Sequence, residues 1–452
     1  MTKIEQSGSV IKPFFTYLIP SLIGLLALTS ANIIDGIVLG RVVGANALAT
    51  ISLLLPWFTF LFALALALAI GGAVNIGYFL GEKSTRKASE VFTVCLFAAV
   101  IINTLIALLS FIFEPQLYAL LQVPNSLLPV IKAYFSVIRW VMILQLFTMV
   151  LYYFVRCDEQ PRLATRALLA GAIINIVLDI VFVAWLDWGV AGAAWATAVA
   201  QVCQCLLLCR YFLISDRRLY FVRVAIWGHI LRHCFTNGAS EFINEVAAGL
   251  LFLVLNILLI RAGGEAGVAA FSIVNYFIFL SIMVYYGIAD ALHVLVSHSM
   301  GARNTQRARQ FFVFAIKLAF SVGALLAIGF LWGGDIAAQG FVSLSDSTLL
   351  ADARAIMLVI WPLFLVNGVN ILVSCYLTAL RKPAPSGLLS LTRGLLLPGS
   401  LLLVLYTYQV SFSADTPKLT DFLIALPIAE WLALLLALLL LYRYQPEPII
   451  PN

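Results

Sequence analysis

Two aspartates lie inside long apolar segments, and both belong to the first half of the chain. Asp35 interrupts the run LIPSLIGLLALTSANIIDGIVLG, and Asp179 interrupts LLAGAIINIVLDIVFVAWL. A carboxylate in the hydrocarbon region of a bilayer costs at least about 2.5–3.5 kcal/mol at the middle of a helix. Such residues usually bind an ion, a proton or a substrate, so we expect the chemistry of the protein at these two positions.

Polar neighbours extend this pair into a candidate proton or cation site. Asn175 lies four residues before Asp179 and therefore shares its helical face. Counted at 1.5 Å per residue from the predicted helix ends, Asp35, Asp179 and Thr197 lie roughly 7, 10 and 14 Å from the same membrane edge. Two close carboxylates in a low dielectric do not both ionise, so the site can hold a proton, and its oxygens also suit sodium. A purely structural role, with hydrogen bonds inside the helical bundle, is the alternative.

The composition requires a membrane to position these residues. The chain has 452 residues, of which 63% are hydrophobic and 11% charged, whereas soluble domains carry about 25% charged residues. The apolar segments are long enough for transmembrane helices and lack the alternation of a β-barrel strand. We therefore predict an all-α integral membrane protein with twelve spans, at 13–39, 48–79, 88–113, 126–153, 161–186, 188–212, 230–260, 266–299, 310–332, 350–379, 386–409 and 420–443.

Basic residues predict the orientation of these spans. Nineteen of the 27 Lys and Arg lie in the two terminal segments and in every second loop. The opposite loops hold three, Arg41, Arg261 and Lys418. The excess of positive charge on one side predicts a multi-pass protein of the prokaryotic cytoplasmic (inner) membrane with both termini in the cytoplasm. Because the basic residues lie at membrane edges, the net charge of +6 indicates topology, and no nucleic-acid partner is expected.

An internal repeat divides the chain into two halves. With an offset of 220 residues, LGRVVGANALATIS (39–52) aligns with LIRAGGEAGVAAFS (259–272), and GEKSTRKASEVF (81–92) aligns with GARNTQRARQFF (301–312). We predict six-helix bundles at 1–212 and 230–452, a cytoplasmic linker at 213–229, and a pseudo-twofold axis along the membrane normal. Such duplication is typical of secondary transporters. No Walker A sequence occurs, so an ion gradient is the expected energy source.

Other positions are weaker candidates. Neither Asp35 nor Asp179 has an acidic counterpart in the second half, which has its own polar groups within predicted spans. These groups are candidates for a substrate path or a second acid site, or they face a water-filled vestibule: Glu241, Glu245, Asn256, Asp290 and His293.

In the first span, Pro20 removes a helix hydrogen bond and predicts a kink, which is either static or part of the movement.

The order of these segments resembles the multidrug and toxic compound extrusion (MATE) family over nearly the whole chain. The segments are IPSLIGLLALTSANIIDGIVLGRVVGANALATISLLLP, NIVLDIVFVAWLDWGVAGAAWATAVAQ, NILLIRAGGEAGVAAFS, GIADALHVLVSHSMGARNTQRAR and TALRKPAPSGLLSLTRG. The acid in the first span and the N-x-x-x-D pair in the fifth are most similar to the prokaryotic DNA-damage-inducible (DinF-like) branch. The resemblance implies that Asp35, Asn175, Asp179 and Thr197 form the cation site and that Pro20 is the kink proline.

The resemblance also implies antiport, in which a proton or a sodium ion enters as a lipophilic, often cationic organic compound leaves. No cofactor is expected beyond the coupling ion. The expected partners are small organic substrates and the lipid bilayer, and we expect a monomer.

A flippase for a lipid-linked precursor is the alternative transporter, although the mid-span cations that its cavity would need are few: Arg139, Lys317, Arg354 and Arg393. An enzyme is disfavoured because no nucleophile with a base and no HExxH motif occurs.

Overall fold

Helices account for nearly all of the structure. The computed structural model describes residues 9–339, 347–412 and 418–445. Within these ranges, twelve helical segments are long and apolar enough to cross a membrane. The twelve predicted spans are therefore confirmed, with ends that shift by a few residues. The two chain termini, predicted to be cytoplasmic, lie outside the described residues.

The chain divides into two compact units. The first comprises Met1–Gly238 with Met300–Arg303, and the second comprises Ala239–Ser299 with Asn304–Asn452. Residues 214–226, which connect the first six spans to the seventh, belong to the first unit.

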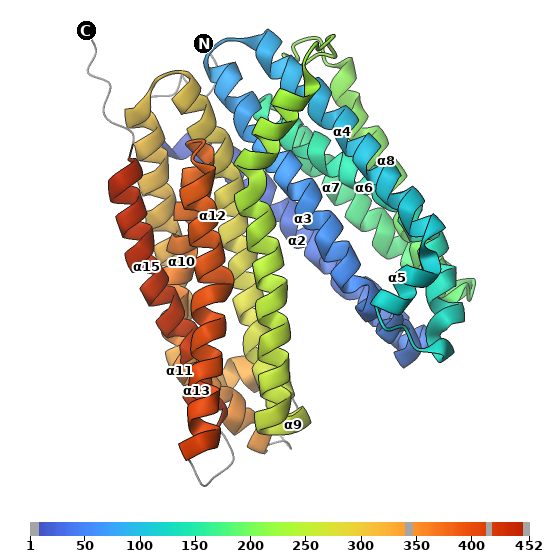
Figure 1. The fold of residues 1–452 in the computed structure, drawn as a ribbon, viewed down its shortest axis with the longest axis vertical. Coiled ribbons are helices and arrows are strands. Elements are labelled where there is room, and N and C mark those ends of the chain that lie inside the picture. Colours follow the sequence, from blue (N-terminus) through green and yellow to red (C-terminus); the bar gives the residue numbers. More distant parts are fainter. Residues whose placement is uncertain (1–8, 340–346, 413–417, 446–452) are drawn as a thin grey trace. The chain divides into compact units, whose positions relative to one another are not determined.

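In the first unit, α7 packs against both α2 and α8, and α6 packs against α3, α4 and α8. This packing brings the spans with Asp35 and Asp179 side by side. The elements, visible in Figure 1, are α2 (Ile11–Val38), η1 (Leu39–Val43), α3 (Ala45–Gly81), α4 (Thr85–Ile112), α5 (Glu114–Leu120), η2 (Asn125–Leu127), α6 (Leu128–Cys157), α7 (Pro161–Asp179), η3 (Ile180–Trp185), α8 (Gly189–Cys209) and η4 (Arg210–Leu213).

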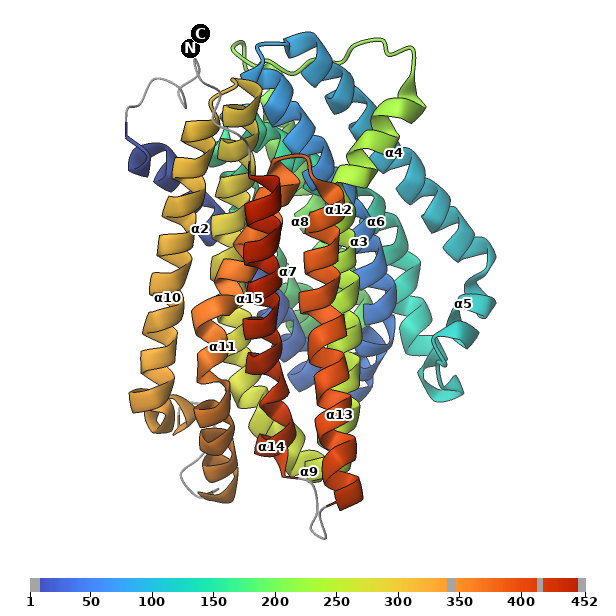
Figure 2. The ribbon, with the colours of Figure 1, turned by 60° about the vertical axis from the view of Figure 1, so that its left-hand side comes forward.

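In the second unit, α11 packs against α10, α12 and α15, and α13 packs against α15. The long helix α9 (Trp227–Gly301), most of which belongs to this unit, is interrupted at Gly264, so it supplies two spans. The other elements, seen from a second side in Figure 2, are α10 (Thr305–Gln339), α11 (Ser347–Ala379), α12 (Pro383–Leu391), η5 (Thr392–Leu396), α13 (Leu397–Phe412), α14 (Leu419–Leu423) and α15 (Ala425–Tyr444).

The internal repeat is visible in the backbone angles. Gly44 has φ 100° and ψ −172°, and Gly264, 220 residues later, has φ 58° and ψ −150°. Side chains rarely adopt this region, so each half turns between its first and second spans at a position that favours glycine. Lys83 and Arg303, also 220 residues apart, both have positive φ, 63° and 57°. The aligned sequences therefore form the same turns.

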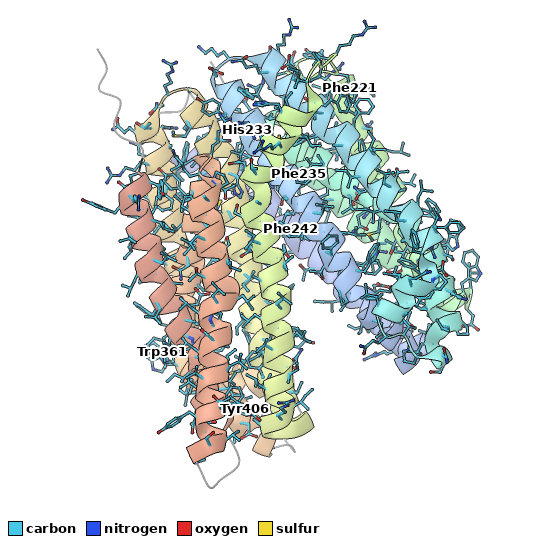
Figure 3. The ribbon with its side chains drawn as sticks, in the orientation of Figure 1. Phe221, His233, Phe235, Phe242, Trp361 and Tyr406 are labelled. Carbon is cyan, nitrogen blue, oxygen red and sulfur yellow. The ribbon has the colours of Figure 1, made fainter. Side chains whose placement is uncertain are left out.

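The segment 214–226, here called the strap, is bound along the first unit. The hydroxyl oxygens of Ser89 and Thr93 on α4 accept hydrogen bonds from the backbone N–H groups of Tyr220 (3.2 Å) and Val222 (3.1 Å). The ring of Phe221, labelled in Figure 3, lies 5.3 Å from the ring of Phe92. Ser89 and Thr93 are four residues apart on one helical face, so they bind alternate residues of an extended chain.

A buried carboxylate fixes the start of the strap. Asp158 follows α6 and accepts hydrogen bonds from the Tyr211 hydroxyl (2.6 Å), the Arg218 backbone N–H (2.8 Å) and Arg218 Nε (2.7 Å). Burial opposes the charge of the Arg218 guanidinium, but the carboxylates of Asp158 and Glu159 outweigh this and hold its pKa above the ordinary value. The strap is thus held by charge-assisted bonds as well as by packing.

Candidate functional site

The two sequence-predicted aspartates lie at matching places on their helices. Asp35 is three residues before the end of α2, and Asp179 is the last residue of α7. Each helix continues into a π-helical segment, η1 after α2 and η3 after α7. Wider turns of this kind are rare and are frequent at functional sites, because they leave backbone groups and side chains in irregular positions.

Asp179 is a buried carboxylate without hydrogen-bond partners. Its side chain is 0% exposed, and neither of its oxygens has a partner among the described residues. Asp35 is half-buried, and its Oδ1 is likewise buried without a described partner. The two carboxylates interact electrostatically, and the Tyr134 side chain is within electrostatic range of both. The structure thus brings the two acids together.

The two other predicted residues lie together in the same unit. The amide nitrogen of Asn175 on α7 donates a 3.4 Å hydrogen bond to the hydroxyl of Thr197 on α8. An amide oxygen, a hydroxyl and two carboxylates are the hard oxygen donors that suit a small cation, and the carboxylates can also take protons. Among the described residues, no group of three or more His, Cys, Asp and Glu side chains that could hold a metal ion occurs.

A buried hydrophobic cluster lies beside the pair of acids. Leu39, Ile138 and Val183 belong to it together with Tyr134, which is within electrostatic range of both carboxylates. This cluster lowers the local dielectric, which strengthens the repulsion between two negative charges and favours their neutralisation by a proton or a cation.

Hydrogen bonds hold the proline segment of α2 from two sides. Pro20 lies inside the helix, and its carbonyl oxygen accepts a 2.9 Å hydrogen bond from the Thr165 hydroxyl of α7. The next residue, Ser21, accepts a 2.5 Å bond from Arg156, whose side chain is nearly fully buried on α6. α2 is therefore anchored at Pro20 and Ser21, and any bending beyond this point moves the part that carries Asp35.

The acids of the second unit form a separate cluster. The imidazole Nε2 of His293 lies 3.8 Å from the Glu241 carboxylate. Asp290 and Glu245 are within electrostatic range of Glu241. Asn256 is half-buried and is not among the described residues that line the cavity of this unit.

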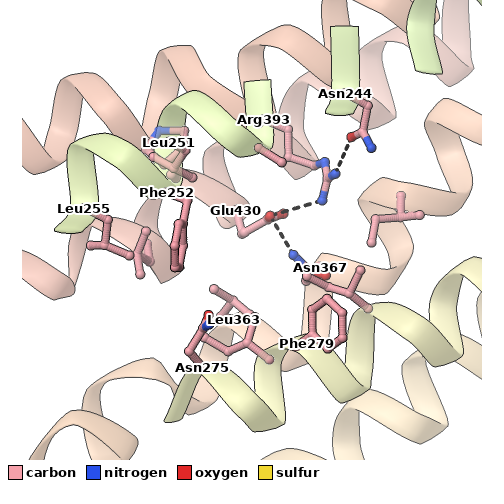
Figure 4. Close-up of a pocket in the computed structure, with 18 of the residues that line it drawn as sticks. Asn244, Leu251, Phe252, Leu255, Asn275, Phe279, Leu363, Asn367, Arg393 and Glu430 are labelled. Atoms are coloured by element: carbon pink, nitrogen blue, oxygen red, sulfur yellow. Dashed lines mark hydrogen bonds and ion pairs between the residues drawn. The ribbon is translucent and has the colours of Figure 1, made fainter. Parts of the chain in front are cut away.

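That cavity lies inside the second unit and has a volume of about 470 Å³. Its walls are mainly aliphatic and aromatic, and one part of the lining, here called the polar end, is a hydrogen-bonded group of Asn244, Asn367, Arg393 and Glu430 (Figure 4). At this end, Glu430 Oε1 accepts a hydrogen bond from Asn367 (2.8 Å) and pairs with Arg393 (3.4 Å), and Arg393 also donates to Asn244 Oδ1 (2.9 Å). Arg393 lies in the π-helical segment η5. The three π-helical segments η1, η3 and η5 thus each contain, or lie within four residues of, an ionisable side chain that is at least half-buried.

Sequence reasoning missed Glu430 and gave Arg393 no role in a site. The signal for Glu430 is present, because it is an acid in the apolar run IAEWLALLLALLLL, and the rule that selected Asp35 selects it as well. Its partners could not be found in this way, because Asn367 is 63 residues away and Arg393 is 37 residues away.

Twelve apolar spans in two related halves, with buried charges at mid-span, define a polytopic helical membrane protein of the kind found among secondary transporters. The chain belongs to the MatE family, whose model matches residues 20–181 and 242–397. The predicted family is therefore confirmed.

Individual relatives support the same conclusion. Multidrug export protein MepA of Staphylococcus haemolyticus (strain JCSC1435) is 23% identical over 97% of this chain and 95% of that protein. An FAD transporter of Shewanella oneidensis is 24% identical over 84% of each chain. The crystal structure of MATE in complex with MaL6 has a TM-score of 0.89 at 23% identity and covers 97% of both chains. The likeness in structure extends over the whole fold.

Proposed function

We propose that the protein is an efflux antiporter that couples the entry of a proton, or of sodium, to the export of lipophilic organic compounds by alternating access. Asp35 and Asp179 bind the coupling ion, and Asn175 and Thr197 complete the site. The substrates are lipophilic and often cationic. The protein works as a monomer in the cytoplasmic membrane, with both termini in the cytoplasm.

The observation that carries this proposal is the fully buried Asp179, whose two oxygens lack described partners beside a second carboxylate. An uncompensated buried charge costs several kcal/mol, on the order of what a proton or a cation would restore by binding. The site therefore favours occupation, and occupation changes its charge. A transporter needs such a change to link ion movement to the shape of the protein.

The anchored proline segment of α2 supplies a means of coupling. A proton on either acid removes their mutual repulsion, so Asp35 and Asp179 approach each other more readily. Because Thr165 and Arg156 hold the helix at Pro20 and Ser21, the approach bends the end of α2 that carries Asp35. The names of MepA, a multidrug export protein, and of the FAD transporter support export or transport of organic molecules as the outcome.

Transport in proteoliposomes tests the proposal. Dye efflux is measured under an imposed proton gradient and, separately, under an imposed sodium gradient, for the wild type and for Asp35→Asn and Asp179→Asn. We expect gradient-driven efflux in the wild type and its loss in both variants. Full pH-driven efflux by the Asp35→Asn protein would refute the role given to Asp35.

A lipid flippase is the second candidate, favoured by the charged pair at mid-span in the second unit. The same vesicles, prepared with a fluorescent lipid in place of the dye, distinguish the two functions. Lipid translocation without dye efflux would replace the antiporter proposal by the flippase.

A further inference from the structure

Unused hydrogen-bonding capacity remains at the polar end of the cavity in the second unit. The Nε of Arg393 and the Oδ1 of Asn367 are buried, and neither atom has a hydrogen-bond partner among the described residues. Both residues line the cavity, and the Arg393 side chain is 10% exposed. A buried donor and a buried acceptor that lack partners are costly, and a ligand that binds both removes this cost.

The carboxylate of Glu430, in contrast, is already occupied. Its Oε1 accepts from Asn367 Nδ2 at 2.8 Å, and its Oε2 accepts from Asn370 Nδ2 at 2.7 Å. The contact to Arg393 Nη1 is longer, at 3.4 Å. The two amides therefore fix Glu430, while Arg393 provides a positive charge whose donors are only partly used.

The rest of the cavity suits a flat apolar body. Three phenylalanines, Phe252, Phe271 and Phe279, line it together with aliphatic side chains such as Leu255 and Leu426. A volume of about 470 Å³ lies within the range of small-molecule sites, which combine apolar walls with a few polar groups that orient the ligand. Aromatic walls favour stacked or edge-on rings.

We propose that this cavity binds aromatic amphiphiles that carry a carboxylate, with the carboxylate received by Arg393 and a neighbouring N–H or O–H of the ligand donated to Asn367 Oδ1. The proposal rests on the export function proposed above and defines one substrate class for it. A carboxylate accepts from a guanidinium with good geometry. An ammonium group would meet the positive charge of Arg393 and find the oxygens of Glu430 already bonded.

Two dyes that differ only in this group provide the test. Rhodamine 110 carries a free carboxylate, and rhodamine 123 is its methyl ester. Equilibrium binding of each dye is measured by fluorescence polarisation on the purified full-length protein in detergent, without any ion gradient. We expect the wild type to bind rhodamine 110 more tightly, and Arg393→Met to raise the Kd for rhodamine 110 by about tenfold or more while changing that for rhodamine 123 little.

Three further variants separate recognition from folding. Arg354→Met is the matched control, because Arg354 is a partly buried arginine of the same unit that donates to the carbonyls of Phe330 and Leu331 and does not line the cavity. It should leave the preference between the dyes unchanged. Glu430→Gln should keep the preference for rhodamine 110. The double variant Arg393→Met with Glu430→Gln removes both charges, so it should fold and should lose the preference.

Equal binding of the two dyes by the wild type, or an equal shift of both dyes in Arg393→Met and in the double variant, would overturn the proposal. Because binding is measured without a gradient, this result is independent of ion coupling. A protein that prefers rhodamine 110 but shows no gradient-driven efflux would refute the antiporter proposal and leave the carboxylate site standing.

Discussion

Two carboxylates buried in the spans, Asp179 in the first unit and Glu430 in the second, have opposite surroundings. Asp179 is 0% exposed and has no hydrogen-bond partner among the described residues. Glu430 is 8% exposed and accepts from two amides and a guanidinium. Burial is nearly equal, so the difference lies in the partners.

The partners determine what each carboxylate can do. A buried acid without hydrogen-bond partners is stabilised when it binds a proton or a cation, so it can change between an empty and an occupied form. An acid whose oxygens are bonded to fixed donors holds those donors in place. Asp179 is thus suited to binding an ion reversibly, and Glu430 to holding Arg393 and two amides in place. Mutations of the two acids should therefore affect different properties.

The largest expected effect is on transport by Asp179→Asn. Removal of the titratable group should lower proton-driven dye efflux by about tenfold or more, because an amide cannot carry the proton. Stability should not fall, since no described hydrogen bond is lost and the uncompensated buried charge is removed. Proteoliposome efflux and thermal unfolding in detergent measure the two quantities. The exposed Asp352 at the start of α11 is the control, and Asp352→Asn should leave efflux unchanged.

The next effect is on stability, in Glu430→Leu. Removal of this carboxylate leaves Arg393 and two amides without their shared acceptor and should destabilise the protein by about 3–5 kcal/mol. The double variant Glu430→Leu with Arg393→Met should recover most of this loss, which unfolding in detergent would detect. If Glu430→Leu were as stable as the wild type, the contrast with Asp179 would be lost.

A third buried carboxylate, Asp158, extends the comparison to a group outside the spans. Its side chain is 1% exposed and, like that of Glu430, is fully bonded. Arg218→Ala removes the guanidinium bond and should cost about 1.5–3 kcal/mol, the range for hydrogen bonds to charged groups. Limited proteolysis of the strap should accelerate in parallel. Arg223→Ala, a change in the same segment at an exposed arginine, should leave both measurements unaltered.

The smallest expected effect is on stability, in variants of the two glycine turns that the internal repeat places in both units. Gly44→Ala and Gly264→Ala should each cost about 1–3 kcal/mol, because both glycines adopt backbone angles that side chains rarely reach. No heavy atom lies within 4 Å of a Cβ added at either position, so the cost is that of the backbone alone. Similar losses of stability in the two variants are expected. Unequal losses would mean that the two turns are constrained differently.

Features that depend on local pattern were predictable from the sequence. The twelve spans follow from segment length and hydrophobicity, and the 220-residue offset aligned Gly44 with Gly264 before their backbone angles were known. The neighbourhood of Asp35 and Asp179 followed from counting residues from the helix ends. It required only that the two spans be adjacent, and α2 and α7 do pack together.

Features that depend on distant partners were not predictable. The polar end of the cavity combines Asn244, Asn367, Arg393 and Glu430, which come from four different elements. Glu430 is noticeable by itself as an acid in an apolar run, but its three partners are not, and no local pattern shows that the four residues meet. The strap posed the same difficulty, because Ser89 and Thr93 read as ordinary helix residues until their partners 131 and 129 residues away are known.

The strap has a consequence for biogenesis. Its hydrogen-bond partners Ser89, Thr93 and Asp158 all precede it in the chain. During synthesis the N-terminal part emerges first and can fold as a unit. The contacts of the strap therefore need no residue that follows it in the chain, so they can form before the second unit is complete. The nascent chain can thus dock the strap on α4 and Asp158 while most of the second unit is still to be inserted.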